Sequence, residues 1–160
     1  MEKQELEFTR MVKEHKSTIY TVCYMFSNDA DEVGDFFQDV LTNLWKGFSS
    51  FEGRSDVRTW IYRVSLNTCI SADRKKRKMK SVPLSMDINP YEDQSEDIRQ
   101  SEMLRQRIAK LGAFDRAIIL LWLENMSYEE IGQVVGISTK NVSVRLFRIK
   151  EQLKRMSNDQ

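Results

Sequence analysis

The sequence has little of what most enzymes use for chemistry. Its 160 residues include a single histidine, His15, and two cysteines, Cys23 and Cys69. The cysteines lack the paired spacing of a zinc site, and no glycine-rich phosphate loop occurs. One histidine on the apolar edge of a helix is more typical of a packed or surface residue than of a catalyst. We therefore expect a protein that is not an enzyme and that uses no cofactor and no metal.

Long apolar runs are missing as well. No stretch approaches the ~20 apolar residues needed to cross a bilayer, and the amino-terminal MEKQELEFTR has no signal-peptide core. The two cysteines lie in apolar segments, which predicts buried free thiols, and free thiols are typical of the reducing cytosol. These features predict a cytoplasmic protein with no membrane insertion.

Strand signals are almost absent, whereas apolar residues recur at helical spacing throughout the chain. Breaks are expected at residues 27–31 and 47–55, where serine, asparagine and glycine gather. Both prolines lie in the polar segment 81–97, which predicts a flexible linker. The expected fold is all-α, with one small helical domain at 1–80 and a second at 98–160.

The charge is nearly balanced in total but segregated along the chain. The formal net charge is +1, made of +2 for residues 1–80, −4 for 81–100 and +3 for 101–160. The charge of each segment, rather than the net charge of the chain, therefore indicates which kind of partner that segment can bind.

The strongest motif begins at Ser127, in SYEEIGQVVGISTKNVSVRLFRIK. Ser127 and Glu130 have the spacing of a capping box. Gly132 is small where two helices would cross, and Gly136 suits a left-handed turn. Ser138 can cap the next helix. Although an ordinary pair of packed helices is the alternative, the spacing, caps and turn residue together predict a helix-turn-helix.

The second helix of this motif is basic on the side away from its apolar stripe. From Ile137 to Met156 there are six basic residues and one acidic residue, Glu151. Asparagine and arginine side chains can read base edges in the major groove, and Val144 could contact a thymine methyl group. Phe147 lies on the same face without an obvious core role. The motif predicts DNA binding.

Two segments of opposite charge precede the linker. Five acidic residues and no basic residue lie between Asp29 and Asp39. Such a surface suits a basic protein partner, or it is merely a solvated helix face.

Residues 51–80 interleave aromatic side chains with cations, as proteins that bind unpaired bases do. For Trp60 and Tyr62 the alternative is a place in the core, and for Asn67 a hydrogen-bonded core amide.

Three motifs in order resemble the extracytoplasmic-function (ECF) group of bacterial RNA polymerase sigma factors. The first motif is DFFQD, which begins at Asp35 and is followed by Leu41 and Trp45. The second runs from Phe51 through RTW at 58–60 to Asn67. The third begins with MSYEEI at Met126 and continues with GIS and RLFR. The similarity spans nearly the whole chain. Two departures are Ile61, where housekeeping sigma factors have a second tryptophan, and Gly34, where the docking helix often has an acidic residue.

The resemblance implies a role for each segment. The core RNA polymerase would be bound by Asp35, Phe36, Gln38 and Asp39. The minus-ten promoter element would be recognised and melted by Arg54, Arg58, Thr59, Trp60, Tyr62, Arg63, Asn67, Arg74, Lys75, Lys76 and Arg77. The minus-thirty-five element would be read by Ser138, Thr139, Lys140, Asn141, Ser143, Val144, Arg145 and Arg148. The resemblance also implies a monomer within the polymerase holoenzyme and an anti-sigma factor as a partner.

The alternative from another class is a two-module transcriptional regulator that binds closed duplex DNA without the polymerase. Such a regulator has no need of the acidic helix or of the Trp60 segment. Those two features favour the sigma-factor interpretation.

Overall fold

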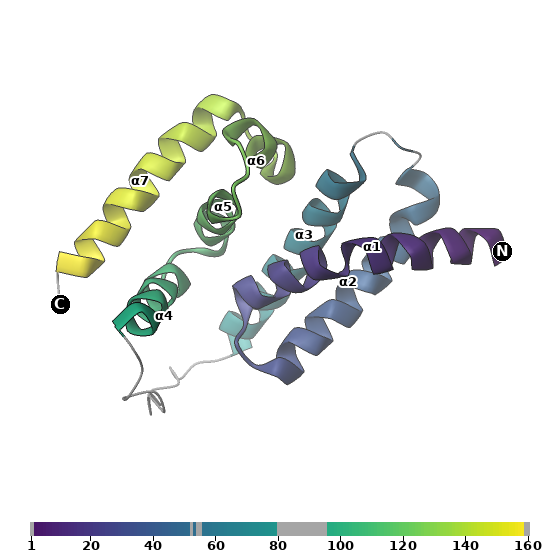
Figure 1. Ribbon diagram of the computed structural model, residues 1–160, viewed down its shortest axis with the longest axis horizontal. Coiled ribbons are helices and arrows are strands. Elements are labelled where there is room, and N and C mark those ends of the chain that lie inside the picture. The colour runs from purple at the N-terminus through teal and green to yellow at the C-terminus, as the bar shows by residue number, and fades with distance from the viewer. Residues whose placement is uncertain (1, 52, 54–55, 80–95, 159–160) are drawn as a thin grey trace.

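The structure, a computed structural model, describes residues 2–51, 53, 56–79 and 96–158. All regular structure in these residues is α-helical, which confirms the predicted all-α class (Figure 1). The helices are α1 (Glu2–Phe26), α2 (Ala30–Phe51), α3 (Val57–Met79), α4 (Glu96–Ala109), α5 (Ala113–Leu123), α6 (Tyr128–Val135) and α7 (Thr139–Asn158).

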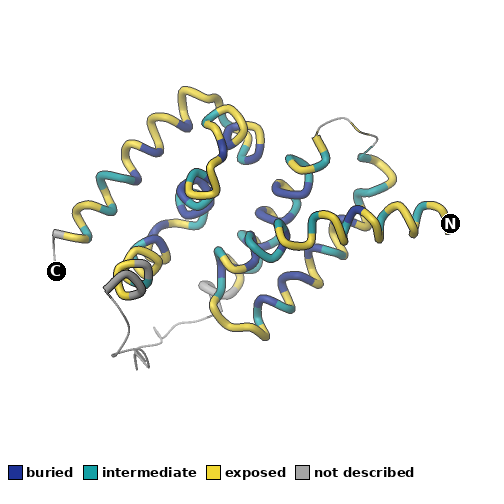
Figure 2. The backbone as a smooth tube through the Cα atoms, viewed as in Figure 1, coloured by how far each residue is buried: buried dark blue, intermediate teal, exposed yellow. Residues whose placement is uncertain are grey.

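Helices α1, α2 and α3 form the amino-terminal module, on the right of Figure 1. Each contributes an apolar stripe to a shared core, seen as the dark blue segments that face inward in Figure 2. The fully buried residues include Ile19, Val22, Val33, Val40, Leu44 and Ile61. The helical spacing of the sequence thus predicted the faces of α1 and α2 that are buried.

Helix α2 extends into the break that the sequence predicts at 47–55 and ends at Phe51. Aromatic packing explains the extension. Phe48 lies edge-on to Phe8 of α1, with the two ring centroids 5.3 Å apart. Phe51 stacks on Trp60 of α3 with the ring centroids 4.5 Å apart. Burial of these rings outweighs the modest cost of Gly47 inside a helix.

Aspartates begin two of these helices. Asp29 accepts a hydrogen bond from the Asp31 amide at 3.0 Å, ahead of α2. Asp56 accepts one from the Arg58 amide at 2.9 Å, ahead of α3. Both side chains satisfy amide groups that would lack a partner at a helix start.

The helix-turn-helix is formed by α6 and α7, and its predicted local details are confirmed. Ser127 and Glu130 make the capping box, and Gly136 adopts a left-handed conformation with φ 82°. A Cβ added at Gly132 would lie 2.6 Å from the Ile137 carbonyl oxygen, so only glycine permits this crossing. The Ser138 hydroxyl accepts from the Asn141 amide at 3.1 Å.

The two cysteines meet although they are far apart in sequence. Cys23 of α1 and Cys69 of α3 are fully buried free thiols, as expected. Their side chains are hydrogen-bonded to each other. This bond holds the pKa of Cys23 below its ordinary value, whereas the same bond and burial raise the pKa of Cys69. The pair joins α1 to α3 inside the core.

The predicted linker, 81–97, lies outside the described residues except for its last two positions. Helix α3 ends at Met79 and α4 begins at Glu96, two residues before the predicted start at 98. Within the part of the chain that the structure describes, no helix is both long enough and apolar enough to cross a membrane.

Candidate nucleic-acid interface

The outer face of α7 carries the side chains that the sequence assigns to promoter reading. The buried stripe of Val142, Leu146 and Ile149 packs on the module, while the far side of α7 is exposed in Figure 2. The structure leaves all eight assigned residues exposed: Ser138, Thr139, Lys140, Asn141, Ser143, Val144, Arg145 and Arg148. Phe147 is 69% exposed on the same helix, which confirms that it has no core role.

Arg145 is held in place by α5. One guanidinium nitrogen, Nη1, lies 2.7 Å from Oδ1 of Asp115, and the guanidinium carbon lies 4.7 Å from the centre of the Phe114 ring. An arginine has five N–H donors, so donors remain for a base or a phosphate. Sequence reasoning missed Asp115 and Phe114, because nothing in the local pattern links residues that are thirty positions from Arg145.

The acidic face of α2 is only partly available to a partner. Asp35, Gln38 and Asp39 are exposed and, at i, i+3 and i+4, lie on one side of the helix. Phe36 is 6% exposed and belongs to the core. The sequence assigned Phe36 to polymerase binding, but its side chain packs inside the module and leaves little surface for a partner.

Structural roles account for part of the acidic cluster. Asp29 caps α2, and Asp31 and Glu32 lie in its first turn, where carboxylates are favoured by the helix dipole. The acids left to recognise a partner are Asp35 and Asp39.

Helix α3 exposes most of its assigned cations. Arg58, Arg63, Asn67, Arg74 and Lys75 are exposed. The helix includes Lys76 and Arg77, whose side chains lie outside the described residues, as does Arg54 altogether. The exposed position of Asn67 argues against the alternative that it is a buried core amide.

The aromatic residues of α3 are less accessible than the sequence suggested. Tyr62 is only 3% exposed, which favours the alternative that its ring belongs to the core. The guanidinium carbon of Arg58 lies 5.6 Å from the centre of this ring. Trp60 is half-buried against Phe51, and Thr59 is also half-buried. Trp60 therefore keeps more of its aromatic surface exposed than Tyr62 does.

No cluster of three or more histidine, cysteine, aspartate or glutamate side chains suited to a metal occurs among the described residues. The surfaces that remain are a cationic recognition helix, a basic α3 and an acidic α2.

Comparison with known proteins identifies the two modules. The family described as Sigma-70 region 2 matches residues 11–79, and the family described as Sigma-70, region 4 matches residues 101–153. The ECF RNA polymerase sigma factor SigW of Bacillus subtilis is 27% identical over 168 residues, covering 95% of this chain and 89% of SigW. The chain belongs to the ECF group of RNA polymerase sigma factors. It is an alternative sigma factor for promoter-specific transcription.

A second relative and two solved structures are also similar to this chain. The RNA polymerase sigma factor YlaC of Bacillus subtilis is 27% identical, covering 91% of this chain and 88% of YlaC. Among solved structures, RpoE of Bartonella quintana, in complex with the anti-sigma factor NepR, aligns with a TM-score of 0.71 at 22% identity, covering 95% of this chain and 97% of RpoE. CnrH, in complex with the cytosolic domain of CnrY, aligns with a TM-score of 0.70 at 20% identity, covering 97% and 90%.

Proposed function

We propose that this sigma factor divides promoter recognition between its modules. Residues 1–80 bind core RNA polymerase and recognise and melt the minus-ten element, and residues 98–160 read the minus-thirty-five element. The observation that carries the proposal is the exposed cationic face of α7, on a helix-turn-helix whose caps and turn fix its direction.

The docking surface for the polymerase is the side of α2 that bears Asp35, Gln38 and Asp39. These side chains are exposed and have no basic neighbour in sequence, so the surface repels DNA phosphates and attracts a basic protein. The binding partner is the core polymerase, which the sigma factor joins as a monomer.

The minus-ten surface runs along α3. Arg63, Asn67 and Arg74 share one side of the helix by their spacing, with Arg58 near its start. Cations on this face hold the backbone of a separated strand, and the half-buried ring of Trp60 supports an unpaired base. Tyr62 supports the helix from within rather than stacking on DNA.

The minus-thirty-five surface is the first half of α7, which enters the major groove in a helix-turn-helix. Asn141 and Arg145 are the residues that can pair with base edges bidentately. Lys140 and Arg148 are suited to phosphate contacts, since both are exposed cations on flexible stems.

An anti-sigma factor is the second protein partner that we propose. A groove of about 880 Å³ lies where α1, α4 and α5 meet, and its walls include the exposed apolar side chains Tyr24, Leu104 and Leu123. An amphipathic helix of an inhibitor would bury these side chains and contact both modules at once.

Binding to sigma-free core polymerase, followed by transcription from a library of random promoters, tests the proposal. We expect tight core binding and initiation at a narrow set of sequences that share two elements. Sequence-specific binding to closed duplex by the protein alone, without core binding, would instead make the chain an ordinary regulator.

A further inference from the structure

We propose that Asp115 of α5 is a positioning residue for the reading of the minus-thirty-five element. It holds Arg145 of α7 so that one edge of the guanidinium, formed by Nε and Nη2, is presented to a guanine. This inference rests on the proposed base-reading role of Arg145. It adds a residue outside the recognition helix to those that determine which promoter is chosen.

The first observation is the hydrogen bond between the two side chains. Nη1 of Arg145 donates to Oδ1 of Asp115 at 2.7 Å, which is the length of a charge-assisted bond. The Arg145 and Asp115 side chains are 46% and 30% exposed. Ion pairs that are this accessible to water contribute little to the stability of a fold. The contact therefore matters for where it places the guanidinium rather than for how strongly it joins α5 to α7.

The second observation is an aromatic ring against the same guanidinium. The centre of the Phe114 ring lies 4.7 Å from the guanidinium carbon of Arg145, and Phe114 itself packs against the hydrophobic core. Two adjacent residues of α5 thus hold Arg145, one through a hydrogen bond and the other through its ring. An arginine that is already held loses less conformational freedom when it binds a base.

The third observation is that other cations of α7 are not held in this way. Lys150 lies further along the helix, with Nζ 3.9 Å from the centre of the Trp122 ring of α5. Within the part of the chain that the structure describes, no ion pair or aromatic ring holds Lys140 or Arg148. Arg145 therefore differs from Lys140 and Arg148 because a neighbouring helix sets its direction.

The geometry of the guanidinium decides what Arg145 can read. Its N–H donors lie in one plane, with Nη1 and Nη2 along one edge and Nε and Nη2 along another. Asp115 occupies Nη1, and no other group among the described residues accepts from Arg145. The edge of Nε and Nη2 therefore keeps two parallel donors. In the major groove only guanine presents two neighbouring acceptors, O6 and N7, so this edge selects guanine.

The charge of Asp115 favours base reading as well. A carboxylate beside Arg145 repels DNA phosphates and opposes binding that depends on phosphates alone. Without the carboxylate, the flexible arginine is free to turn to a phosphate, and a phosphate contact carries no sequence information. Asp115 thus keeps Arg145 available for a base.

A purely structural role for Asp115 is the alternative. Asp115 lies in the first turn of α5, where the helix dipole favours a carboxylate. Loss of that stabilisation would weaken the whole module, whereas loss of positioning would affect the one base pair that Arg145 reads. The two roles therefore differ in which base pairs respond.

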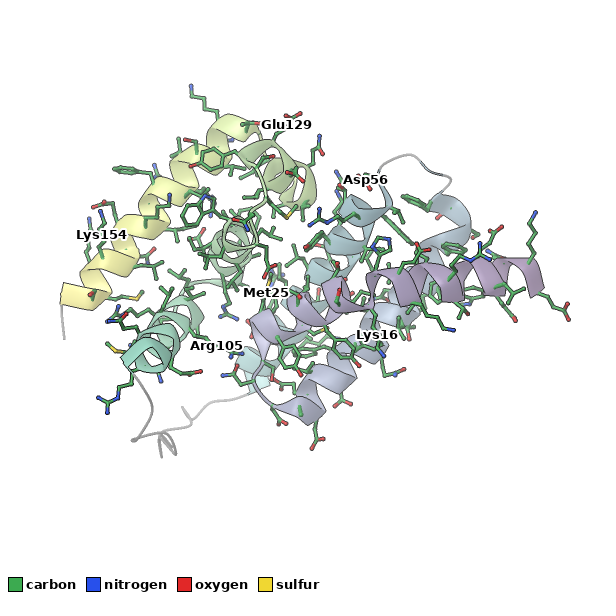
Figure 3. The ribbon with its side chains drawn as sticks, viewed as in Figure 1. Lys16, Met25, Asp56, Arg105, Glu129 and Lys154 are labelled. Carbon is green, nitrogen blue, oxygen red and sulfur yellow. The ribbon has the colours of Figure 1, made fainter. Side chains whose placement is uncertain are left out.

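The experiment uses the full chain in holoenzyme with core polymerase. Binding is measured by competition at one salt concentration, on random duplex and on a promoter whose minus-thirty-five base pairs are replaced in turn. The variants are Asp115→Ala, Arg145→Ala and the two together. The matched control is Glu151→Ala, which removes a carboxylate 3.6 Å from Nζ of Lys154. Figure 3 shows Lys154 towards the carboxy-terminal end of α7, away from the turn that follows α6.

We expect Arg145→Ala to abolish a preference for guanine at one base pair, and Asp115→Ala to weaken the same preference by about fivefold or more. Preferences at the other base pairs and the unfolding midpoint should stay unchanged. Asp115→Ala should bind random duplex equally well or more tightly, because a negative charge near phosphates is lost. The double variant should match Arg145→Ala at this base pair, since Asp115 acts through Arg145. Glu151→Ala should retain every preference.

An unchanged guanine preference in Asp115→Ala, beside a clear loss in Arg145→Ala, would overturn the positioning role. A uniform loss at all base pairs with a lower unfolding midpoint would also overturn it, because Asp115 would then only stabilise α5. A larger loss in the double variant than in Arg145→Ala would overturn it by showing that Asp115 acts through another residue. If Arg145→Ala itself changes no base preference, the proposed base-reading role of Arg145 fails, and the positioning role fails with it.

Discussion

The two modules differ in how locally their structure is determined. In the carboxy-terminal module, residues 127–138 carry the capping box, the close-crossing glycine and the left-handed turn within a dozen positions. In the amino-terminal module, the decisive contacts are long-range, such as Phe8 with Phe48 and Cys23 with Cys69. The helix-turn-helix is therefore readable from a short sequence window, whereas the three-helix module is not.

Their surfaces differ in the same way. The recognition face of α7 is what remains once its apolar stripe is buried, so burial and exposure follow one periodicity. The acidic surface of α2 mixes side chains that start the helix with side chains free to recognise a partner. A cluster of charged residues in the sequence therefore indicates a binding surface only after the residues that cap or begin a helix have been set aside.

The largest expected effect is on polymerase binding by the amino-terminal module. Replacing Asp35 and Asp39 together with lysine places positive charge against a basic partner, where like charges cost several kcal/mol. We expect core affinity to fall by at least about a hundredfold, measured by fluorescence anisotropy of the labelled chain, while the unfolding midpoint stays unchanged.

The matched control for this variant is the pair Glu7→Lys and Glu14→Lys. It changes the net charge equally at two exposed positions of α1. Equal losses of core affinity in both pairs would reduce the docking assignment to a general effect of charge.

The second prediction compares a glycine of each module, Gly132 and Gly34, by the effect of its replacement on the free energy of unfolding. Gly132→Ala forces the Ile137 carbonyl away from a position 2.6 Å from the new methyl group, and we expect a loss of about 1–3 kcal/mol in the free energy of unfolding. Gly34→Ala in α2 meets nothing within 4 Å and should stabilise the chain by up to about 1 kcal/mol. Urea unfolding of both variants measures the contrast, and equal effects would contradict it.

The third prediction concerns base reading by α7. Arg145→Ala should reduce discrimination of the minus-thirty-five element by about 1–3 kcal/mol if Arg145 reads a guanine. Lys154→Ala is the control, because it removes the same charge from an exposed position further along the helix. Competition between promoter and random duplex gives the measurement, and an equal loss on both duplexes would identify Arg145 as a phosphate contact.

The smallest expected effect is the pH dependence of the capping box. Hydrogen bonds from Ser127 hold the pKa of Glu130 below its ordinary value of 4.5. A carboxyl with a lowered pKa stabilises the fold at pH values above that ordinary value, and the stabilisation is lost as the pH falls through the lowered one. Glu130→Gln keeps an acceptor but cannot titrate, so its melting temperature should fall less than that of the parent between about pH 6 and pH 3. If the melting temperatures of the parent and of Glu130→Gln fall by the same amount over this pH range, the ionised Glu130 carboxylate does not stabilise the capping box.

The sequence predicted most helices and the exposure of the assigned residues of α7, but it assigned two buried aromatic residues to contact surfaces. Phe36 and Tyr62 have the residue types of a contact surface, yet both are buried. On an amphipathic helix, an aromatic residue at the edge of the apolar stripe can face either way, and only the neighbouring helices decide. The continuation of α2 to Phe51 was missed for a related reason, since Phe8 and Trp60 lie far away in sequence.

The sequence by itself determined the helical class, the helix-turn-helix and the alternation of acidic and basic segments, because periodicity, caps and charge are properties of neighbouring residues. Tertiary structure decided what lies against each surface. The pairing of Asp73 with Arg116, the hold of Asp115 on Arg145 and the contact of Arg63 with Gln133 join residues thirty to seventy positions apart. Such contacts depend on how helices pack in space, which no local pattern of residues specifies.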